Sequence, residues 1–387
     1  MSPARHLRIG RGLGPAPLLV LALVLALLTL AACGGGAGGS GSSGGSSGGT
    51  SGGQGAPGEL PDEEKVLHLF IWTEYMPDDV IRDFEAEYGV RVVVDNYSSN
   101  EEMLAKLQAG GQGQYDVVVP SDYTIEIMVR QGLLEPLDRS KIPNMANLAE
   151  EHRDPSYDPG NQYTVPYMWG TAGIAYNKAY VDPEPTSWAD IWDPKYAGRI
   201  VLLDDSRVIP GMALQLLGYS MNETDPARLE EAKAKLLELA PRVKAYDSDS
   251  PKSLLISEEV WLGVVWSAEA VLAAQENPNI AYVLPREGGN LWKDNLAIPK
   301  DAPHPGWAHV FINYVLRPDV GARIAEAFPY GTPNAEALKL LPEEIRSNPA
   351  AYPPVEALRN AEVLVDVGDA VAAFDRILTE MKVAAGQ

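Results

Sequence analysis

From residue 65 onward, short apolar runs alternate with stretches whose apolar residues recur at helical spacing. Residues 66–72, 90–94 and 116–119 are short and mainly apolar, and we expect each to form a strand. Between the first two strands a helix is expected to begin at Pro77 and to end at Gly89, since proline favours a first helical turn and glycine a helix end. The alternation of strand and helix predicts an α/β lobe with a largely parallel sheet.

A second series of the same kind begins near residue 167. Its pattern predicts strands at residues 173–176, 199–203, 261–266 and 281–284, and helices at residues 212–219, 227–239 and 268–275. In the first series, Ser98 and Glu101 have the spacing of a capping box at a helix start. Residues 296–299 indicate a return of the chain to the first lobe. Lobes joined by more than one crossing would form a hinge that closes over a ligand.

Size and charge support a two-lobed exported protein. The chain has 387 residues, with 31 Lys and Arg against 53 Asp and Glu, a formal net charge of −22. Removing Arg5, Arg8 and Arg11 with a leader leaves 28 basic residues and a net charge of about −25. A surface this acidic repels nucleic acid and attracts cations, although the same charge also keeps an exported protein soluble. The remaining length of about 330 residues is more than one core usually serves.

The N-terminal residues have the pattern of a bacterial lipoprotein signal. Basic residues precede an apolar run at residues 18–30, and Ala31 and Ala32 precede Cys33. The run is short for a membrane span, and in such a signal the cysteine receives diacylglycerol. We therefore expect residues 1–32 to be a signal peptide and residues 33–60 to be a lipidated Cys33 with a flexible Gly/Ser linker. The protein would be anchored in the periplasm or on the outer face of the cell membrane.

No pattern in the sequence indicates an enzyme, a metal site or a cofactor. HExxH, GxSxG and GxxxxGK[ST] motifs are all absent. Lipidation would use Cys33, the single cysteine, and the five histidines match no metal-binding spacing. We expect no catalytic activity, cofactor or metal centre. An extracytoplasmic glycosidase with paired carboxylates is the alternative from another class.

Acidic and aromatic residues follow several predicted strands, where ligands bind in open α/β sheets. Residues 72–75 and 121–123 follow strands of the first series, and Asp205 and Trp266 follow strands of the second. An aromatic face attracts an alkylammonium by about 0.5 to 2 kcal/mol, and a carboxylate binds its charged end by a charge-assisted hydrogen bond. These strand ends therefore favour a cationic amine with an aliphatic stem, such as a polyamine.

Structural roles for the same residues are the alternative. Tryptophan is buried on average, so Trp72, Trp266 and Trp292 could belong to the core. Asp205 and Asp294 could instead cap helices or lie in solvated loops. We expect packing roles for two further tryptophans on helical spacing, Trp188 and Trp192.

Eight short segments occur in the same order as in a known family. They are WTEY at 72–75, YDVVVPSDY at 115–123, PYMWG at 166–170, TSWAD at 186–190, LDD at 203–205, WKD at 292–294, LAIP at 296–299 and LRPD at 316–319. From about residue 65 nearly to the C-terminus, the chain resembles the spermidine/putrescine-binding proteins of bacterial ABC importers.

The resemblance implies a two-lobed periplasmic-binding-protein fold. Each lobe would be a mostly parallel sheet flanked by helices, with the ligand cleft between the lobes. Residues 61–170 and 293–338 would form the first lobe, and residues 171–292 and 339–387 the second. The protein would be a monomer that delivers a polyamine to an ABC permease driven by an ATPase, with no nucleic-acid partner. A sensory role is also open.

The resemblance also implies a set of ligand-binding residues. These are Trp72, Thr73, Glu74, Tyr75, Ser121, Tyr123, Asp205, Ser248, Trp266, Trp292, Asp294 and Tyr330. Asp294 would bind a primary ammonium, and Asp205 the other end of the ligand or an internal amine. Another small cationic amine, or ferric ion bound by tyrosines, is the alternative ligand for the same fold.

The chain departs from the family where ligand length is selected. Spermidine binders carry glutamate where Val208 stands and glutamine where Leu364 stands. One corner of the cleft is therefore poorer in acceptors. We expect the shorter diamine to bind as well as spermidine, unless Asp204 or Asp122 compensates.

Overall fold

The computed structural model describes residues 61–387. The predicted signal peptide, Cys33 and the linker lie outside these residues. Within the described part of the chain, no helix is long and apolar enough to cross a membrane.

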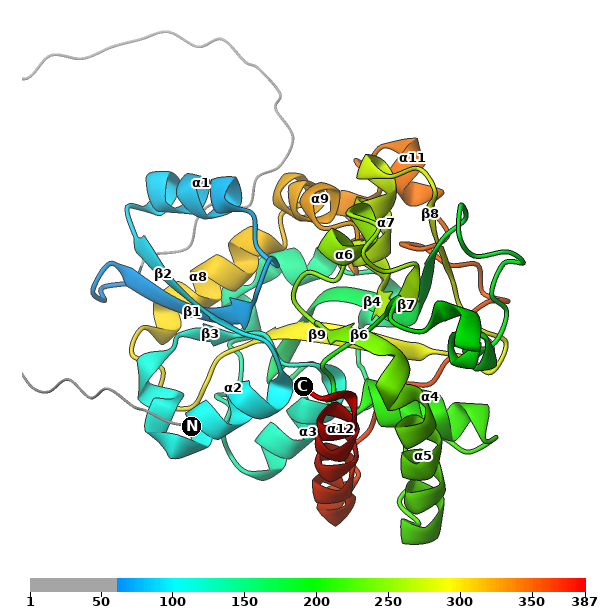
Figure 1. The fold of residues 1–387 in the computed structure, drawn as a ribbon. Coiled ribbons are helices and arrows are strands. Elements are labelled where there is room, and N and C mark those ends of the chain that lie inside the picture. The colour runs from blue at the N-terminus through cyan, green and yellow to red at the C-terminus, as the bar shows by residue number, and fades with distance from the viewer. Residues whose placement is uncertain (1–60) are drawn as a thin grey trace, which may run out of the picture. The chain divides into compact units, whose positions relative to one another are not determined.

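Strands and helices alternate along most of the described chain (Figure 1). The strands are β1 (Val66–Trp72), β2 (Arg91–Tyr97), β3 (Val117–Val118), β4 (Thr164–Asn177), β5 (Ile200–Leu202), β6 (Val243–Tyr246), β7 (Leu262–Trp266), β8 (Ile280–Val283) and β9 (Asn290–Ala297). The helices are α1 (Asp78–Tyr88), α2 (Asn100–Lys106), α3 (Asp122–Arg130), α4 (Val208–Leu216), α5 (Pro226–Leu239), α6 (Lys252–Ile256), α7 (Ser267–Glu276), α8 (Pro305–Val315), α9 (Pro318–Ala327), α10 (Ala335–Leu338), α11 (Glu343–Arg346) and α12 (Val371–Ala385).

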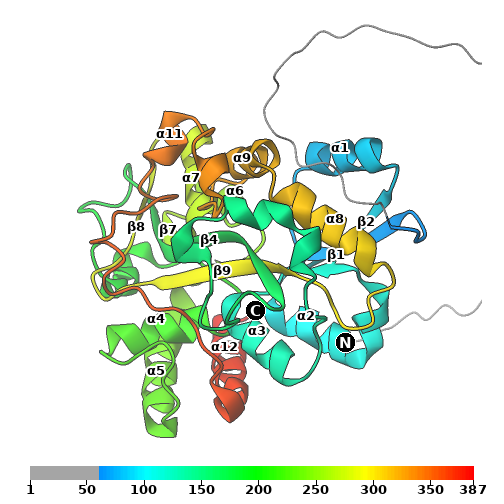
Figure 2. The same cartoon turned by 180° about the vertical axis from the view of Figure 1, so that it is seen from behind.

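Two groups of parallel strands are joined by two antiparallel strands. The order in the sheet is β2-β1-β3-β9-β4-β7-β5-β6, with β8 paired to β4. β1 is parallel to β2 and β3, and β5 is parallel to β6 and β7. β9 and β4 run antiparallel to their neighbours, and Figure 2 shows β9 running from one group to the other. The predicted alternation is confirmed, and β4 and β9 are the exception to the parallel arrangement.

Helices cover both faces of each parallel group. Along β1, Leu67 and Leu69 face the core beneath α1 and α8, whereas Phe70 faces the core beneath α2 and α3. Figure 1 shows these helix pairs on opposite sides of β1. Successive side chains of a strand point to opposite faces, so an apolar strand buried on both faces requires a helix layer on each.

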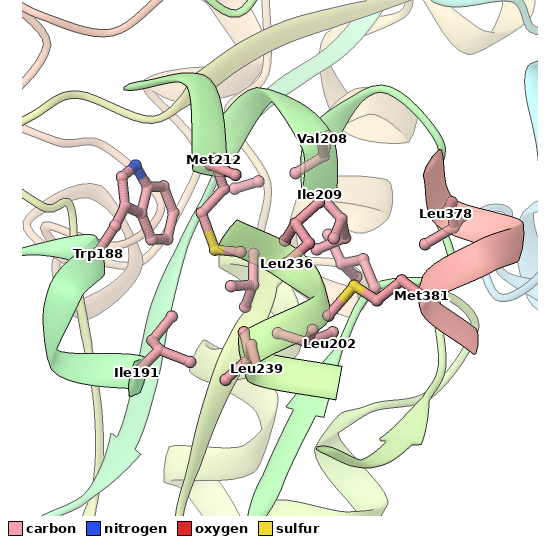
Figure 3. Packing of buried hydrophobic residues seen from close by; sticks show 14 of the residues in the cluster. Trp188, Ile191, Leu202, Val208, Ile209, Met212, Leu236, Leu239, Leu378 and Met381 are labelled. Carbon is pink, nitrogen blue, oxygen red and sulfur yellow. The ribbon is translucent and has the colours of Figure 1, made fainter. Parts of the chain in front are cut away.

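A second large core lies among α4, α5 and α12 (Figure 3). Met212 and Leu236 contribute from α4 and α5, and Met381 contributes from the C-terminal helix. The packing role predicted for Trp188 is confirmed, because its side chain is fully buried in this core and its indole N–H donates to Gln215 Oε1 at 2.9 Å. Trp192 packs against the same core in a partly buried position.

Two local predictions need correction. The residue that caps α2 is Ser99, which accepts a hydrogen bond from the N–H of Glu102, whose carboxylate in turn accepts from the N–H of Ser98. The predicted pair of Ser98 and Glu101 is therefore wrong by one residue. β4 begins at Thr164, well before the predicted residue 173. The lobe boundaries proposed from the sequence stay a prediction.

Candidate ligand-binding site

A cavity lies where β1, β3, β5 and β7 end, and the empty space in it, including the part that is open to solvent, is about 730 Å³. All the cleft residues predicted from the sequence line it, namely Trp72, Thr73, Glu74, Tyr75, Ser121, Tyr123, Asp205, Ser248, Trp266, Trp292, Asp294 and Tyr330. Val208 and Leu364, the two positions at which the chain departs from the family, line it as well. The structure thus brings together residues that are up to 292 positions apart, from Trp72 to Leu364.

Asp294 on β9 is a buried carboxylate with hydroxyl groups at both oxygens. Tyr75 donates to Oδ2 at 2.8 Å and Ser121 donates to Oδ1 at 2.6 Å. An isolated antiparallel bridge between Ser121 and Asp294 aligns their backbones. Burial raises the pKa of Asp294 to about 7, although both hydroxyl hydrogen bonds act in the opposite direction. Each carboxylate oxygen has a second lone pair, so the group can still accept from an ammonium.

Four aromatic rings form a continuous wall beside Asp294. The ring centroids of Trp266 and Trp292 are 6.1 Å apart, those of Trp292 and Tyr330 are 5.0 Å apart, and those of Tyr330 and Tyr75 are 5.7 Å apart. All three pairs meet edge to face, a favourable geometry for aromatic rings. Gly170 on β4 makes room for this wall, because a Cβ there would lie 2.6 Å from the Trp292 ring.

Asp205 lies at the start of α4 and serves as its cap. Its Oδ1 accepts from the N–H of Arg207 at 2.9 Å and from the N–H of Val208 at 2.7 Å. Within residues 61–387, Oδ2 has no hydrogen-bond partner, so it can accept from a ligand. Burial raises the pKa of Asp205. The capping alternative and the binding prediction are therefore compatible, since they use different oxygens.

Tyr123 and Glu101 stand next to Asp205. The Tyr123 hydroxyl donates to Glu101 Oε1 at 3.1 Å, and burial together with the charge of Asp205 raises the pKa of Glu101 to about 7. The guanidinium of Arg207, which is 1% exposed, lies 5.3 Å from the centroid of the Tyr123 ring. Of these residues, Tyr123 and Asp205 line the cavity, whereas Glu101 and Arg207 do not.

The two carboxylates suggested as compensation for Val208 are both engaged elsewhere. Asp204 binds Lys382 Nζ at 2.7 Å and does not line the cavity. Asp122 does line it, but its oxygens accept from the N–H groups of Tyr123 and Lys293. Burial raises the pKa of Asp122 to about 8.

Glu74 and Ser248 complete the predicted set in different ways. The carboxylate of Glu74 pairs with Lys252 Nζ at 2.5 Å. Ser248 accepts the indole N–H of Trp266 at its carbonyl, at 3.2 Å. The buried hydroxyl of Ser248 has no partner among the described residues. Thr73 lies between Trp72 and Glu74 on the same loop.

Sequence reasoning missed several lining residues, namely Ser98, Asn100, Asp249, Glu269 and Asn290. Asn100 is the first residue of α2, and its amide donates to the hydroxyls of Ser121 and Tyr123 at 3.0 and 3.1 Å. Glu269 is in the first turn of α7, directly after β7. Asn100 and Glu269 both stand in the first helical turn after a strand, and this position was the sequence feature that could have indicated them.

The fold and the cavity together define a solute-binding protein of the two-lobed periplasmic type. The chain belongs to the bacterial extracellular solute-binding protein family, whose model matches residues 79–353. It is accordingly a substrate-binding transport protein and not an enzyme.

Three relatives illustrate the similarity. The spermidine/putrescine-binding periplasmic protein of Escherichia coli is 41% identical over 322 residues, which cover 83% of this chain and 92% of that protein. The solved spermidine/putrescine ABC transporter substrate-binding protein of Streptococcus pneumoniae is 38% identical with a TM-score of 0.70. The match covers 83% of this chain and 100% of that chain. The TpPotD lipoprotein of Treponema pallidum is 32% identical with a TM-score of 0.73, covering 82% of this chain and 99% of that chain. These matches confirm the predicted fold class and the resemblance.

Proposed function

We propose that this chain is a lipid-anchored, monomeric extracytoplasmic protein that binds putrescine or spermidine and delivers it to an ABC permease and its ATPase. The observation that carries the proposal is the buried carboxylate of Asp294, which lies between two hydroxyls beside a wall of four aromatic rings. A buried carboxylate needs a positive partner, and a primary ammonium supplies that counter-charge.

The other end of the cavity supports a second ammonium. Asp205 has a free oxygen there, and Glu101 and Tyr123 lie beside it. Between the two ends, the methylene stem of a polyamine would lie against Trp266 and Trp292, since aromatic faces attract alkylammonium groups and bury apolar area. Ser248 also lines the cavity, and its buried hydroxyl has no partner among the described residues.

The relatives support the ligand and the anchor. Two of them are named as spermidine/putrescine-binding proteins, and a third is titled a lipoprotein. The predicted signal peptide at residues 1–32, followed directly by Cys33, fits that last description. Closure of the two lobes, 61–170 with 293–338 and 171–292 with 339–387, would enclose the ligand.

Ferric ion is a poorer match to this cavity. A tyrosine ligand to iron must be deprotonated, whereas burial raises the pKa of Tyr75, Tyr123 and Tyr330 well above its ordinary value. The two tryptophans of the aromatic wall also offer no oxygen ligands for a hard cation.

Calorimetric titration of residues 59–387 with putrescine, and separately with spermidine, tests the proposal. We expect saturable binding of one ligand per chain and a rise in melting temperature with either amine. Butylamine, which has one ammonium, is the control and should bind at least about tenfold more weakly because one charged contact is lost. No heat and no change in melting temperature with either polyamine would overturn the assignment.

The anchor is tested in the full-length chain. Expressed in a bacterial host, it should partition with the membrane and incorporate labelled palmitate. Cys33→Ser should abolish the label and release the processed chain or leave it as an unprocessed precursor. Equal labelling of both chains would overturn the anchor and leave the ligand unaffected.

A further inference from the structure

Lys252, the first residue of α6, holds its ammonium between two carboxylates that line the cavity. Its Nζ lies 2.5 Å from Oε2 of Glu74, and 3.1 and 3.2 Å from the two carboxylate oxygens of Glu269. Both glutamates line the cavity. A cation that belongs to the protein thus occupies a place where an ammonium of a ligand would otherwise be attracted.

The three charged groups come from separate elements. Glu74 lies on the loop after β1, in a left-handed backbone conformation with φ of 50°, and Glu269 lies in the first turn of α7. The side chains of Lys252 and Glu269 are 17% and 7% exposed, whereas that of Glu74 is 48% exposed. The contact with Glu269 is therefore little screened by solvent. Burial works against the charge on Lys252, but the two glutamates outweigh it and raise the pKa of the lysine.

The two glutamates of this cluster line the same cavity as Asp294. Tyr330 lines the cavity together with both carboxylates, and burial, followed by the charges of Glu269 and Asp294, raises its pKa. Tyr330 is also part of the aromatic wall. An ammonium at Glu269 and a second one at Asp294 would consequently lie along the same wall.

We infer that Lys252 determines specificity: its ammonium fills a cation position at Glu74 and Glu269, so that the cavity accepts a diamine more readily than a triamine. The inference rests on the proposed polyamine function and deepens it. A triamine needs an acceptor for one more ammonium than a diamine does. With Lys252 in place, the two glutamates are neutralised in part, and a further cation beside them is repelled.

The same contact also ties α6 to the loop after β1, and this second effect must be separated from the first. A tie between elements changes the stability of the closed form, and it therefore alters the affinity for every ligand by a common factor. A filled cation position changes the ratio between ligands. The ratio of the dissociation constants for putrescine and spermidine is therefore the decisive quantity.

The experiment compares four variants with the wild-type chain by calorimetric titration with both amines. Lys252→Met removes the ammonium and keeps the stem, and Lys252→Arg keeps the charge. Lys252→Met combined with Glu74→Gln and Glu269→Gln removes both acceptors that the first change exposes. Lys244→Met is the matched control, because it removes one lysine charge at an exposed position outside the cavity.

In Lys252→Met we expect the affinity for spermidine, relative to that for putrescine, to rise at least about tenfold, since one charge-assisted contact becomes available. Lys252→Arg, Lys244→Met and the triple variant should keep the wild-type ratio within about threefold. An unchanged ratio in Lys252→Met, with both affinities altered equally, would overturn the inference. Should Lys252→Met fail to fold, Lys252→Gln gives the same comparison, because its amide can donate to both glutamates without a charge. Absence of binding by the wild-type chain would instead contradict the proposed function.

Discussion

Asp294 shows at the scale of one residue how burial and hydrogen bonding prepare a carboxylate for a cation. The side chain is 5% exposed, and the hydroxyls of Tyr75 and Ser121 hold its two oxygens in place. Because its position is already fixed, little conformational entropy is lost when an ammonium arrives.

Asp294→Asn should lower the affinity for putrescine by about 100-fold, since it removes the charge opposite a desolvated ammonium. The fold should persist, because the amide has nearly the same shape and can accept from one hydroxyl and donate to the other. Calorimetry and thermal unfolding measure the two effects. Asp369→Asn, at an exposed position outside the cavity, is the control. An affinity within threefold of wild type would remove Asp294 from the binding site.

Binding should also depend on pH through the same group. The pKa of Asp294 is raised to about 7 in the ligand-free fold, above the ordinary value near 4 in an unfolded chain. The empty folded state therefore holds this proton more tightly than the unfolded state, and it gains stability as the pH falls from about 7 toward 4. A cationic ligand favours the ionised carboxylate, so its affinity falls over the same range.

The rise in melting temperature that putrescine causes should accordingly grow between pH 5.5 and pH 8. Scanning fluorimetry with an extrinsic dye, with and without ligand, measures this difference. In Asp294→Asn, the rise in melting temperature caused by putrescine should vary less with pH. Glu101, with a pKa raised to about 7, would contribute in the same direction. A ligand-induced shift of constant size across this range would contradict the assignment.

Single residues were predictable where they follow a strand directly. Trp72, Asp205 and Trp266 stand at strand ends, and such positions face the ligand in open α/β sheets. Asn100 and Glu269 were not predicted, because only the packing of α2 and α7 turns their first helical turn toward the cavity. Hydrophobic periodicity carries no information on that direction for a single polar residue.

At the scale of one element, α4 is bound to the site through its cap. Asp205 accepts two N–H groups at the start of α4 with a single oxygen. Asparagine is as good a cap as aspartate, whereas replacing aspartate by alanine at such a position typically costs about 0.5 to 2 kcal/mol.

Asp205→Asn and Asp205→Ala should therefore separate capping from binding. Both variants should lose at least about tenfold in spermidine affinity, since the charge is gone. Only Asp205→Ala should lose stability, by about 1 kcal/mol. Chemical unfolding of the ligand-free chain and calorimetric titration supply the two readings. Equal losses of stability in both variants would show that the carboxylate charge, and not the capping oxygen, stabilises α4.

Element prediction succeeded for regular patterns and failed for interrupted ones. The predicted extent of the first strand matches β1, and α1 is flanked by Pro77 and Gly89, the two residues predicted to limit it. β4 was predicted too short, because Pro166 breaks the strand pattern, and the register with β9 shifts between Pro166 and Met168. Proline lacks the N–H that a strand ladder needs, so its presence argues against a strand interior. Tertiary pairing with β9 overrides that signal.

At the scale of the whole molecule, charge governs how a cation arrives. The chain carries a formal net charge of −22, which attracts cations toward the protein as a whole. Long-range attraction of this kind is screened within about 10 Å at 0.1 M salt. The aromatic wall and the buried carboxylates are less affected, because solvent ions do not reach them.

The dissociation constants should thus rise with sodium chloride between about 20 and 500 mM, with a steeper rise for the triamine than for the diamine, in line with their charges. Calorimetric titration at several salt concentrations measures the slopes. Potassium chloride should give the same slopes. Affinities independent of salt would show that the surface charge has no part in capture.

Chain length and the two series of strands and helices predicted two lobes, but the way in which the two groups of strands are joined was not predictable from the sequence. Alternating strands and helices indicate α/β lobes. The hydrophobic pattern of residues 290–297 does not show, however, whether this strand joins the two groups of parallel strands or belongs to one of them. The partners of β9 are β3 and β4, which lie far away in the sequence. Pairing over such separations depends on the whole fold, and not on local preference.

The aromatic wall has an optical consequence. Trp266 and Trp292 line the cavity as a close pair, whereas Trp188 and Trp307 are fully buried in the two cores. An ammonium that settles against the pair changes the electric field at both indoles and displaces water around them. The intrinsic ultraviolet emission of the unlabelled protein therefore contains its own signal of occupancy, over a constant background from the core tryptophans.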